Sequence, residues 1–139
     1  MATGVGYAMR HRIPGIEVLT VQPEQAPGMT LSLRAGHAVD AGPPATIADA
    51  VAGRYGLPEV LNDLREVVTS ALLVREESIR DAMRILYRRS GLIVEPAAAL
   101  GIAAILENRD RFRGRTVATI ICGGNISITD FEKLVAQNS

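Results

Sequence analysis

The sequence predicts an α/β fold with parallel strands and flanking helices, and three apolar runs support this prediction. Residues 116–121 (TVATII) are β-branched and almost wholly apolar, as expected of a strand that is buried on both faces of a parallel sheet. Residues 16–21 and 67–74 also predict strands. Each of these two runs precedes a segment with helical periodicity, at 29–35 and at 76–89.

Helix boundaries are marked by proline and glycine. Gly36 is expected to stop the helix over 29–35, and Gly91 the helix over 76–89, whose charges we interpret as a solvated face. Two more helices are expected over 3–12 and 58–66, separated by a turn-rich linker over 40–44.

The segment 96–106 is apolar on all sides, which predicts a buried helix. Pro96 suits the first helical turn, so Glu95 takes the N-cap position. Residues 108–114 follow as an exposed connector.

A glycine turn, Cys122-Gly123-Gly124-Asn125, ends the strand over 116–121, and a last helix follows it. Thr129 is expected to open this helix, with Glu132 completing a capping box. Its apolar stripe is formed by Phe131, Leu134 and Val135, whereas Glu132, Lys133 and Gln137 face out.

Composition excludes several classes of function. The 139 residues carry a formal net charge of zero and few aromatic side chains, which argues against nucleic acid and anionic membranes as partners. A single cysteine excludes an internal disulfide and a multi-cysteine metal site. No signal peptide is visible and the longest apolar run is too short to span a bilayer, so a cytoplasmic protein is expected.

Four stretches of the sequence carry a family resemblance: 18–28 (VLTVQPEQAPG), 46–50 (TIADA), 92–104 (LIVEPAAALGIAA) and 122–125 (CGGN). In the same order they resemble the motifs GVEPEGAP, TIADG, LVVEPAGAAALAA and SGGN of the fold-type II pyridoxal-phosphate (PLP) enzymes. These are the threonine and serine dehydratases and serine racemases of the tryptophan synthase beta-like superfamily. The matched stretches span nearly the whole chain and correspond to the C-terminal half of such an enzyme.

The resemblance implies PLP as cofactor and assigns contacts to it. Cys122 stands where the family has a Ser or Cys that hydrogen-bonds the pyridine nitrogen, and Gly123 and Gly124 complete that turn. Glu95 would lie near the same ring, and Ala50 replaces a glycine that lies against the cofactor in the family. Other interpretations stay open: a buried apolar cysteine or a thiol nucleophile for Cys122, and a plain N-cap for Glu95.

The implied chemistry is elimination of water from a hydroxy amino acid. Cysteine thiols ordinarily have a pKa of about 8.5 and are mostly neutral at pH 7, so a thiol does not protonate the ring as an Asp would. The weaker electron sink suits elimination, which gives an enamine that hydrolyses to a 2-oxo acid and ammonia. Threonine, serine, a hydroxyaspartate and racemisation all remain open as the native task.

The sequence also departs from the family pattern. The Schiff-base lysine of the family lies in the N-terminal half, ahead of these residues, so no catalytic residue is assigned, and Lys133 is a poor candidate. The family's glycine-rich phosphate loop would end before Met1. Gln22 and Gly28 occupy positions where some members bind a divalent cation, and neither offers a carboxylate, so no metal is expected. His37 is expected in an exposed loop.

The resemblance assigns residues 1–45 to part of the large cofactor-binding domain and residues 46–139 to the remainder of its C-terminal part, with the small domain and the N-terminal half mostly absent. Alone, the chain is expected to be inactive. Three hypotheses follow: part of a complete threonine/serine ammonia-lyase, one subunit of a split PLP enzyme, or a non-catalytic interaction module. The expected partners are a small amino-acid substrate, the N-terminal half or a partner subunit, and further copies of the chain in a homo-oligomer.

Overall fold

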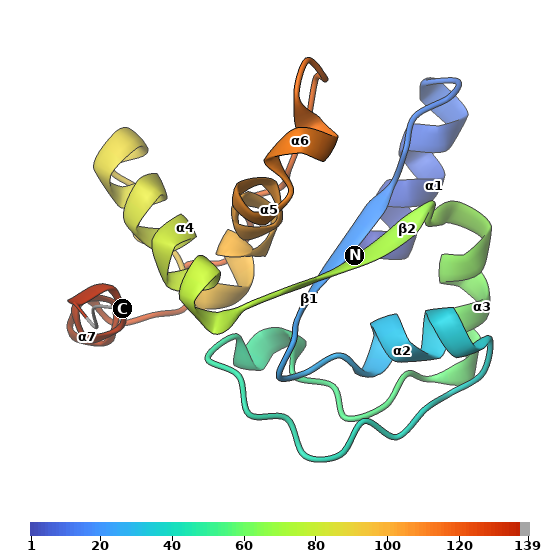
Figure 1. The fold of residues 1–139 in the computed structure, drawn as a ribbon, viewed down its shortest axis with the longest axis horizontal. Coiled ribbons are helices and arrows are strands. Elements are labelled where there is room, and N and C mark those ends of the chain that lie inside the picture. Colours follow the sequence, from blue (N-terminus) through green and yellow to red (C-terminus); the bar gives the residue numbers. More distant parts are fainter. Residues whose placement is uncertain (137–139) are drawn as a thin grey trace.

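The computed structural model describes residues 1–136 as helices around a two-stranded parallel sheet (Figure 1). The strands are β1 (Leu19–Pro23) and β2 (Ser70–Val74). The helices are α1 (Ala2–Arg12), α2 (Gly28–Ala35), the 3-10 helix η1 (Asp49–Val51), α3 (Pro58–Val67), α4 (Glu76–Ser90), α5 (Pro96–Glu107), α6 (Arg109–Phe112) and α7 (Ile128–Ala136). The predicted α/β class with parallel strands is confirmed.

The sheet is covered by helices on both faces. Leu19 pairs with Ser70 and Pro23 with Val74, so both strands end at the same edge. Helix α5 packs on one face with α4 outside it, and α2 packs on the other face beside α3 (Figure 1). Side chains alternate between these faces, because successive residues of a strand point to opposite sides. Val21 packs toward the core that contains α5, whereas Gln22 bonds Thr30 of α2.

The main core lies between α4, α5 and the sheet. Val74, Ile79 and Met83 are fully buried there. The α5 side of the contact is largely alanine, including Ala99 and Ala103, which lets the two helices approach closely. This confirms the predicted apolar face of α4 and the buried α5. Both predicted glycine stops, Gly36 and Gly91, have left-handed backbone at the helix C-termini.

Two strands begin later than the sequence predicts. β1 starts at Leu19 rather than at residue 16, and β2 starts at Ser70 rather than at residue 67. Val67 instead closes α3 and packs against α1, where a Cβ on Gly6 would lie 2.8 Å from Val67 Cγ2. Short apolar runs fit a strand or the end of a buried helix equally well, so periodicity alone does not place such a boundary.

The predicted strand over 116–121 is wrong. Residues 116–121 form no ladder within the described chain, and Val117 and Ile120 are exposed rather than buried on two faces. A hollow of about 580 Å³, bounded by Leu19 and Val21 on the sheet and by residues 116–119, separates the segment from the strands. A strand needs a neighbour at hydrogen-bonding distance, and here the segment runs along α5 instead.

The start of the last helix also differs from the prediction. Ser127, not Thr129, caps α7: its Oγ accepts a hydrogen bond from Asp130 N at 3.0 Å and donates one to Asp130 Oδ2 at 2.7 Å. The reciprocal partner is therefore Asp130 rather than Glu132. Phe131 is buried as predicted, and Gln137 lies outside the described residues.

The connector over 108–114 contains the short helix α6. Arg111 of this connector and Arg115 just after it both pair with Glu17 ahead of β1, whereas Arg113 pairs with Asp110 within the connector. The two pairs with Glu17 lower the pKa of that carboxyl, chiefly through the Arg115 hydrogen bond. Across residues 1–136, none of the helices has the length and apolar character that a membrane crossing requires.

Candidate functional site

The glycine turn over 122–125 is presented on the surface between two apolar anchors. Ile121 and Ile126 flank it and pack against the core of α4 and α5, whereas residues 122–125 are exposed. Ile126 N also donates to Gly124 O at 2.8 Å, which tightens the bend. The turn is therefore held at both ends while its own atoms remain accessible to a ligand.

Glu95 clamps this turn from the start of α5. Its backbone N donates to Gly123 O at 3.2 Å, and its Oε2 accepts a hydrogen bond from Asn125 N at 3.0 Å. A Cβ on Gly123 would overlap Glu95 Oε1, and the backbone there has φ +139°, which L side chains rarely adopt. Only glycine fits this position. Glu95 stands at the N-cap of α5 as predicted, but its side chain bonds the turn and not its own helix.

Cys122 is exposed, so the interpretation of a buried apolar cysteine is wrong. Its Sγ lies 3.5 Å from Met1 Sδ, which brings the first residue before α1 beside the turn. The two histidines bond nearby carbonyl oxygens, His11 that of Tyr7 and His37 that of Ala38. Both are exposed, as predicted for His37, and these contacts show no base beside the thiol.

Ala50 lies on η1, a separate element that packs against α5. Ala50 is exposed, while Ala48 just before it is fully buried in the α4–α5 core. Asp49 Oδ1 accepts a hydrogen bond from Ala50 N at 2.8 Å, the local structural role that is common for an Asp beside a turn. Helix α5 thus contacts η1 and begins directly after Glu95, although Ala50 belongs to a different segment of the chain from the glycine turn.

Lys133 lies on the outer face of α7, as predicted. Its side chain is 69% exposed and its Nζ is 3.2 Å from Asp130 Oδ1. Hydrogen bonding by Ser127, followed by Lys133, lowers the pKa of Asp130. Gln22 Oε1 accepts hydrogen bonds from Thr30 N and Oγ1, so this oxygen is used inside the fold. Among residues 1–136 no group of three acidic, cysteine or histidine side chains could hold a metal ion.

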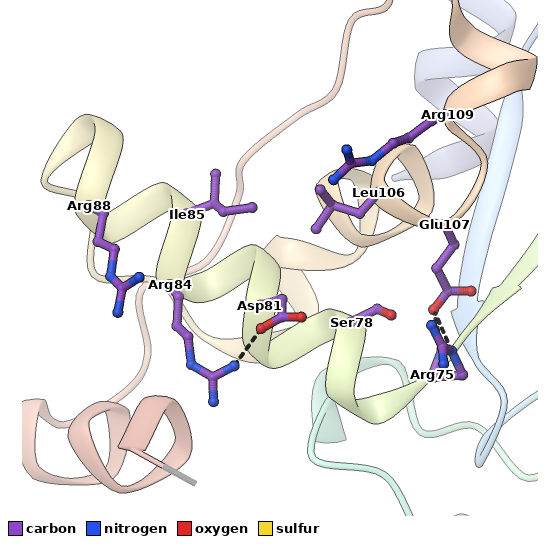
Figure 2. Close-up of a pocket in the computed structure, with 9 residues that line it drawn as sticks. All are labelled: Arg75, Ser78, Asp81, Arg84, Ile85, Arg88, Leu106, Glu107 and Arg109. Carbon is purple, nitrogen blue, oxygen red and sulfur yellow. Dashed lines mark hydrogen bonds and ion pairs between the residues drawn. The ribbon is translucent and has the colours of Figure 1, made fainter. Parts of the chain in front are cut away.

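A polar groove of about 310 Å³ between α4 and the C-terminal end of α5 is separate from this site (Figure 2). Arg75 pairs there with Glu107, and Arg84 with Asp81 at 2.5 Å. Figure 2 shows these pairs along the groove wall, with Arg88 directed away from the α5 side. Neither Glu95 nor Cys122 lines the groove, so we interpret its pairs as surface electrostatics.

Sequence reasoning missed one residue, Glu76. Its Oε2 accepts a hydrogen bond from Ile47 N at 2.9 Å, so this first-turn acid of α4 is not part of a solvated face. The sequence did contain one indication of this role: Glu76 lies two residues after the end of a strand, where a side chain can reach the neighbouring loops.

The residues present fit one side of a PLP molecule. An exposed thiol beside a glycine turn can hydrogen-bond a ring nitrogen, and Gly124 leaves open space at the exposed turn, where the atom nearest its Cβ position among residues 1–136 is Ile93 O at 3.9 Å. The start of α1, near Cys122, offers helix N–H groups of the kind that favour a phosphate. The exposed, paired Lys133 does not fit the anchor of the cofactor aldehyde.

Comparison with known proteins decides the family. The sequence pattern of the pyridoxal-phosphate dependent enzymes matches residues 1–123. The chain belongs to this family. L-threonine ammonia-lyase of Thermotoga maritima is 32% identical over 135 residues, which cover 97% of this chain and 33% of that protein. Serine racemase of Schizosaccharomyces pombe is 28% identical over 137 residues, which cover 99% of this chain and 42% of that protein.

Solved structures of the family share the fold. A threonine deaminase (from T.th.) superposes with a TM-score of 0.85 and 36% identity, covering 91% of this chain and 45% of that one. Maize serine racemase superposes with a TM-score of 0.84 and 26% identity, covering 94% and 41%. The chain thus spans between a third and just under half of the length of these four proteins. The resemblance and the predicted cofactor are confirmed.

Proposed function

We propose that this chain supplies the ring-nitrogen side of the active site of a PLP-dependent threonine/serine ammonia-lyase, which converts a β-hydroxy amino acid to a 2-oxo acid and ammonia. The observation that carries the proposal is the Glu95 clamp: it fixes the bend of Gly123 and leaves the Cys122 thiol exposed. The identity to threonine ammonia-lyase and threonine deaminase supports the choice of reaction.

Each residue of the proposed site has a defined role. When bound, PLP supplies an electron sink for the carbanion formed at the substrate's α-carbon. The Cys122 thiol hydrogen-bonds the pyridine nitrogen without transferring a full proton to it. Gly124 lets the backbone approach the ring, and Gly123 forms the bend of the same turn, which Glu95 holds in place. Ala50 lies against the cofactor, where its methyl limits the space for the ring.

The remaining roles belong to residues outside this set. In our proposal, residues 1–45 and 46–139 are both parts of the large cofactor-binding domain. The lysine that anchors the cofactor and the phosphate loop come from an N-terminal segment, either of the same polypeptide or of a partner subunit. We further propose that the protein forms a homo-oligomer, because both edges of the β1–β2 sheet lack a neighbouring strand within the described chain. A cytoplasmic location is a separate proposal, on which the sheet has no bearing.

The first experiment measures the intact mass of the protein made by its own cell. A mass near 14.8 kDa favours the split enzyme, with a separate lysine-bearing subunit. A larger mass favours a single polypeptide. Because a mass alone tests no chemistry, the isolated protein or complex is then assayed for 2-oxo acid release from threonine, serine and hydroxyaspartate. Loss of PLP absorbance during purification under mild conditions, together with no product from any of the three, contradicts the proposal.

Substitution of Cys122 tests the ring contact in the same preparation. Cys122→Ser keeps a hydrogen-bonding group and should retain activity within about threefold. Cys122→Ala removes it and should lower kcat by about tenfold, the size expected for one hydrogen bond in a closed site. Equal activity of the serine and alanine variants contradicts the assigned role of Cys122. If neither the PLP spectrum nor any turnover is present in the parent protein, the non-catalytic interaction module is favoured instead.

A further inference from the structure

Glu76 connects the first turn of α4 to the segment that carries Ala50. Helix α4 begins two residues after Val74, where β2 ends, so Glu76 lies at the carboxyl edge of the sheet. Its Oε2 accepts a hydrogen bond from Ile47 N at 2.9 Å, across 29 residues of sequence. The interaction is partly buried, which shields it from competing water.

The other hydrogen bonds within this segment are short in range. Thr46 Oγ1 accepts from Ala48 N, and Asp49 Oδ1 accepts from Ala50 N. Such bonds shape the backbone locally but do not fix its place relative to α4 or α5. Two longer hydrogen bonds tie the segment to other parts of the fold: Ala45 N to Gln25 O at 3.0 Å, which joins it to the loop before α2, and Ile47 N to Glu76, which joins it to α4. Ile47, Ala48 and Val51 also pack against the core, so the bond to Glu76 adds a directional contact to apolar packing.

The second carboxylate oxygen of Glu76 gives further evidence on the role of this side chain. Within residues 1–136, its second oxygen, Oε1, is buried and has no hydrogen-bond partner. Burial of an unpaired carboxylate oxygen is unfavourable and offsets the favourable effect of an acid in the first turn of α4. The bond to Ile47 is the route by which its side chain acts on a neighbouring segment.

The geometry points to Glu76 as a positioning residue of the cofactor site, which fixes residues 46–50 so that Ala50 and η1 are held against α5. This inference rests on the proposed function for its link to PLP. Its structural part, the control of Ile47 by Glu76, can be measured separately. Glu76 does not touch the reacting atoms in this proposal and acts through the Ile47 backbone.

The test compares three variants of the protein or complex as isolated: Glu76→Ala, Glu76→Gln and Glu77→Ala. Glu77 is the matched control, because it is an acid in the same first turn, so its loss changes the helix-end charge equally. Glutamine keeps a side-chain carbonyl that can accept from Ile47 N. Hydrogen exchange of the amides of residues 46–50 and the dissociation rate of bound PLP, followed by its absorbance and circular dichroism, are the two readouts.

We expect Glu76→Ala to speed exchange at Ile47 by about tenfold and PLP loss by about three- to tenfold, with a changed cofactor circular dichroism. Glu76→Gln should restore both to within about twofold of the parent, as should Glu77→Ala. Unchanged exchange at Ile47 in Glu76→Ala, or equal effects of Glu77→Ala, overturns the inference. If the parent binds no PLP, the proposed function fails and the cofactor role of Glu76 fails with it. Faster exchange at Ile47 would then still support its hold on the segment.

Discussion

The α4–α5 pair and the segment over 113–127 are neighbours in space but are held in different ways. In the pair, Ile79 and Met83 are fully buried, and stability is spread over many apolar contacts. In the segment, only Ile121 and Ile126 are partly buried, and its place depends on a few individual contacts at Glu95, at Gly101 and at Glu17. Stability therefore resides mainly in the first region, and the geometry of the candidate site in the second.

The largest effect is expected from shortening a buried side chain in the α4–α5 pair. Met83→Ala should lower the free energy of unfolding by about 2–5 kcal/mol, because it leaves a cavity among fully buried side chains. Ile85→Ala is the matched control on the same helix: Ile85 is 38% exposed, and the loss should stay below about 1 kcal/mol. Urea unfolding of both variants measures the difference. Equal losses would show that α4 is not packed as described.

The next largest effect is expected from a substitution that distorts the glycine turn over 122–125 and leaves the core intact. Gly123→Ala forces a side chain onto a backbone with φ +139° and into Glu95, at a cost of about 1–3 kcal/mol in local strain. We expect PLP to be retained about tenfold less tightly, with the unfolding midpoint of the α4–α5 core little changed. Gly53→Ala is the control outside the turn, because the nearest atom to its Cβ would be Tyr55 O at 3.8 Å. Similar cofactor retention in both variants would contradict the assigned turn geometry.

A third prediction tests how the segment rests on α5. Alanine normally stabilises a helix interior by up to about 1 kcal/mol over glycine, but a Cβ on Gly101 would overlap Thr119 Oγ1. Gly101→Ala should therefore destabilise the parent protein. The same change should be stabilising in a Thr119→Gly background, where both the overlapping oxygen and the Thr119 Cβ, at 3.0 Å from the added Cβ, are gone. A double-mutant cycle by urea unfolding measures this change of sign, and additivity would show that residues 116–119 do not rest on Gly101.

The smallest effect concerns the loop that carries η1. A bidentate contact with Arg54, followed by the Gly42 N–H bond, lowers the pKa of Asp40 to about 2 from its ordinary 3.8. A carboxyl group whose pKa is lowered by folding stabilises the protein at pH values above its ordinary pKa, and this stabilisation is lost as the pH falls toward about 2. The parent should therefore have a higher Tm than the Asp40→Asn variant at about pH 6, and this difference in Tm should disappear as the pH falls toward about 2. Because the pair is exposed, we expect only a small gap.

Sequence reasoning placed most helices, because their boundaries carry local chemical signals. Gly36 and Gly91 end helices where predicted, and Pro58 and Pro96 begin them. The strand over 116–121 was predicted wrongly, because its apolar residues indicate a strand without saying whether a partner lies beside it. Its Val117 and Ile120 are exposed along α5 in the described chain.

The candidate site was predictable only in part. Glu95 and the glycine turn were both singled out from their sequence patterns, but their hydrogen bond joins residues 95 and 125, and nothing in the local sequence encodes that contact. Glu76 was missed because an acid in a first helical turn is usually explained by the helix dipole. Ala50 as a cofactor contact stays a prediction.

The exposed Cys122 offers a single point of chemical labelling. It is the only cysteine in the sequence, so a thiol-reactive dye or spin label attaches at one known atom in the turn. The rate of that modification becomes a direct measure of how often a ligand shields the turn. Titration with PLP, with and without a lysine-bearing partner, would then report assembly of the site without any need for turnover.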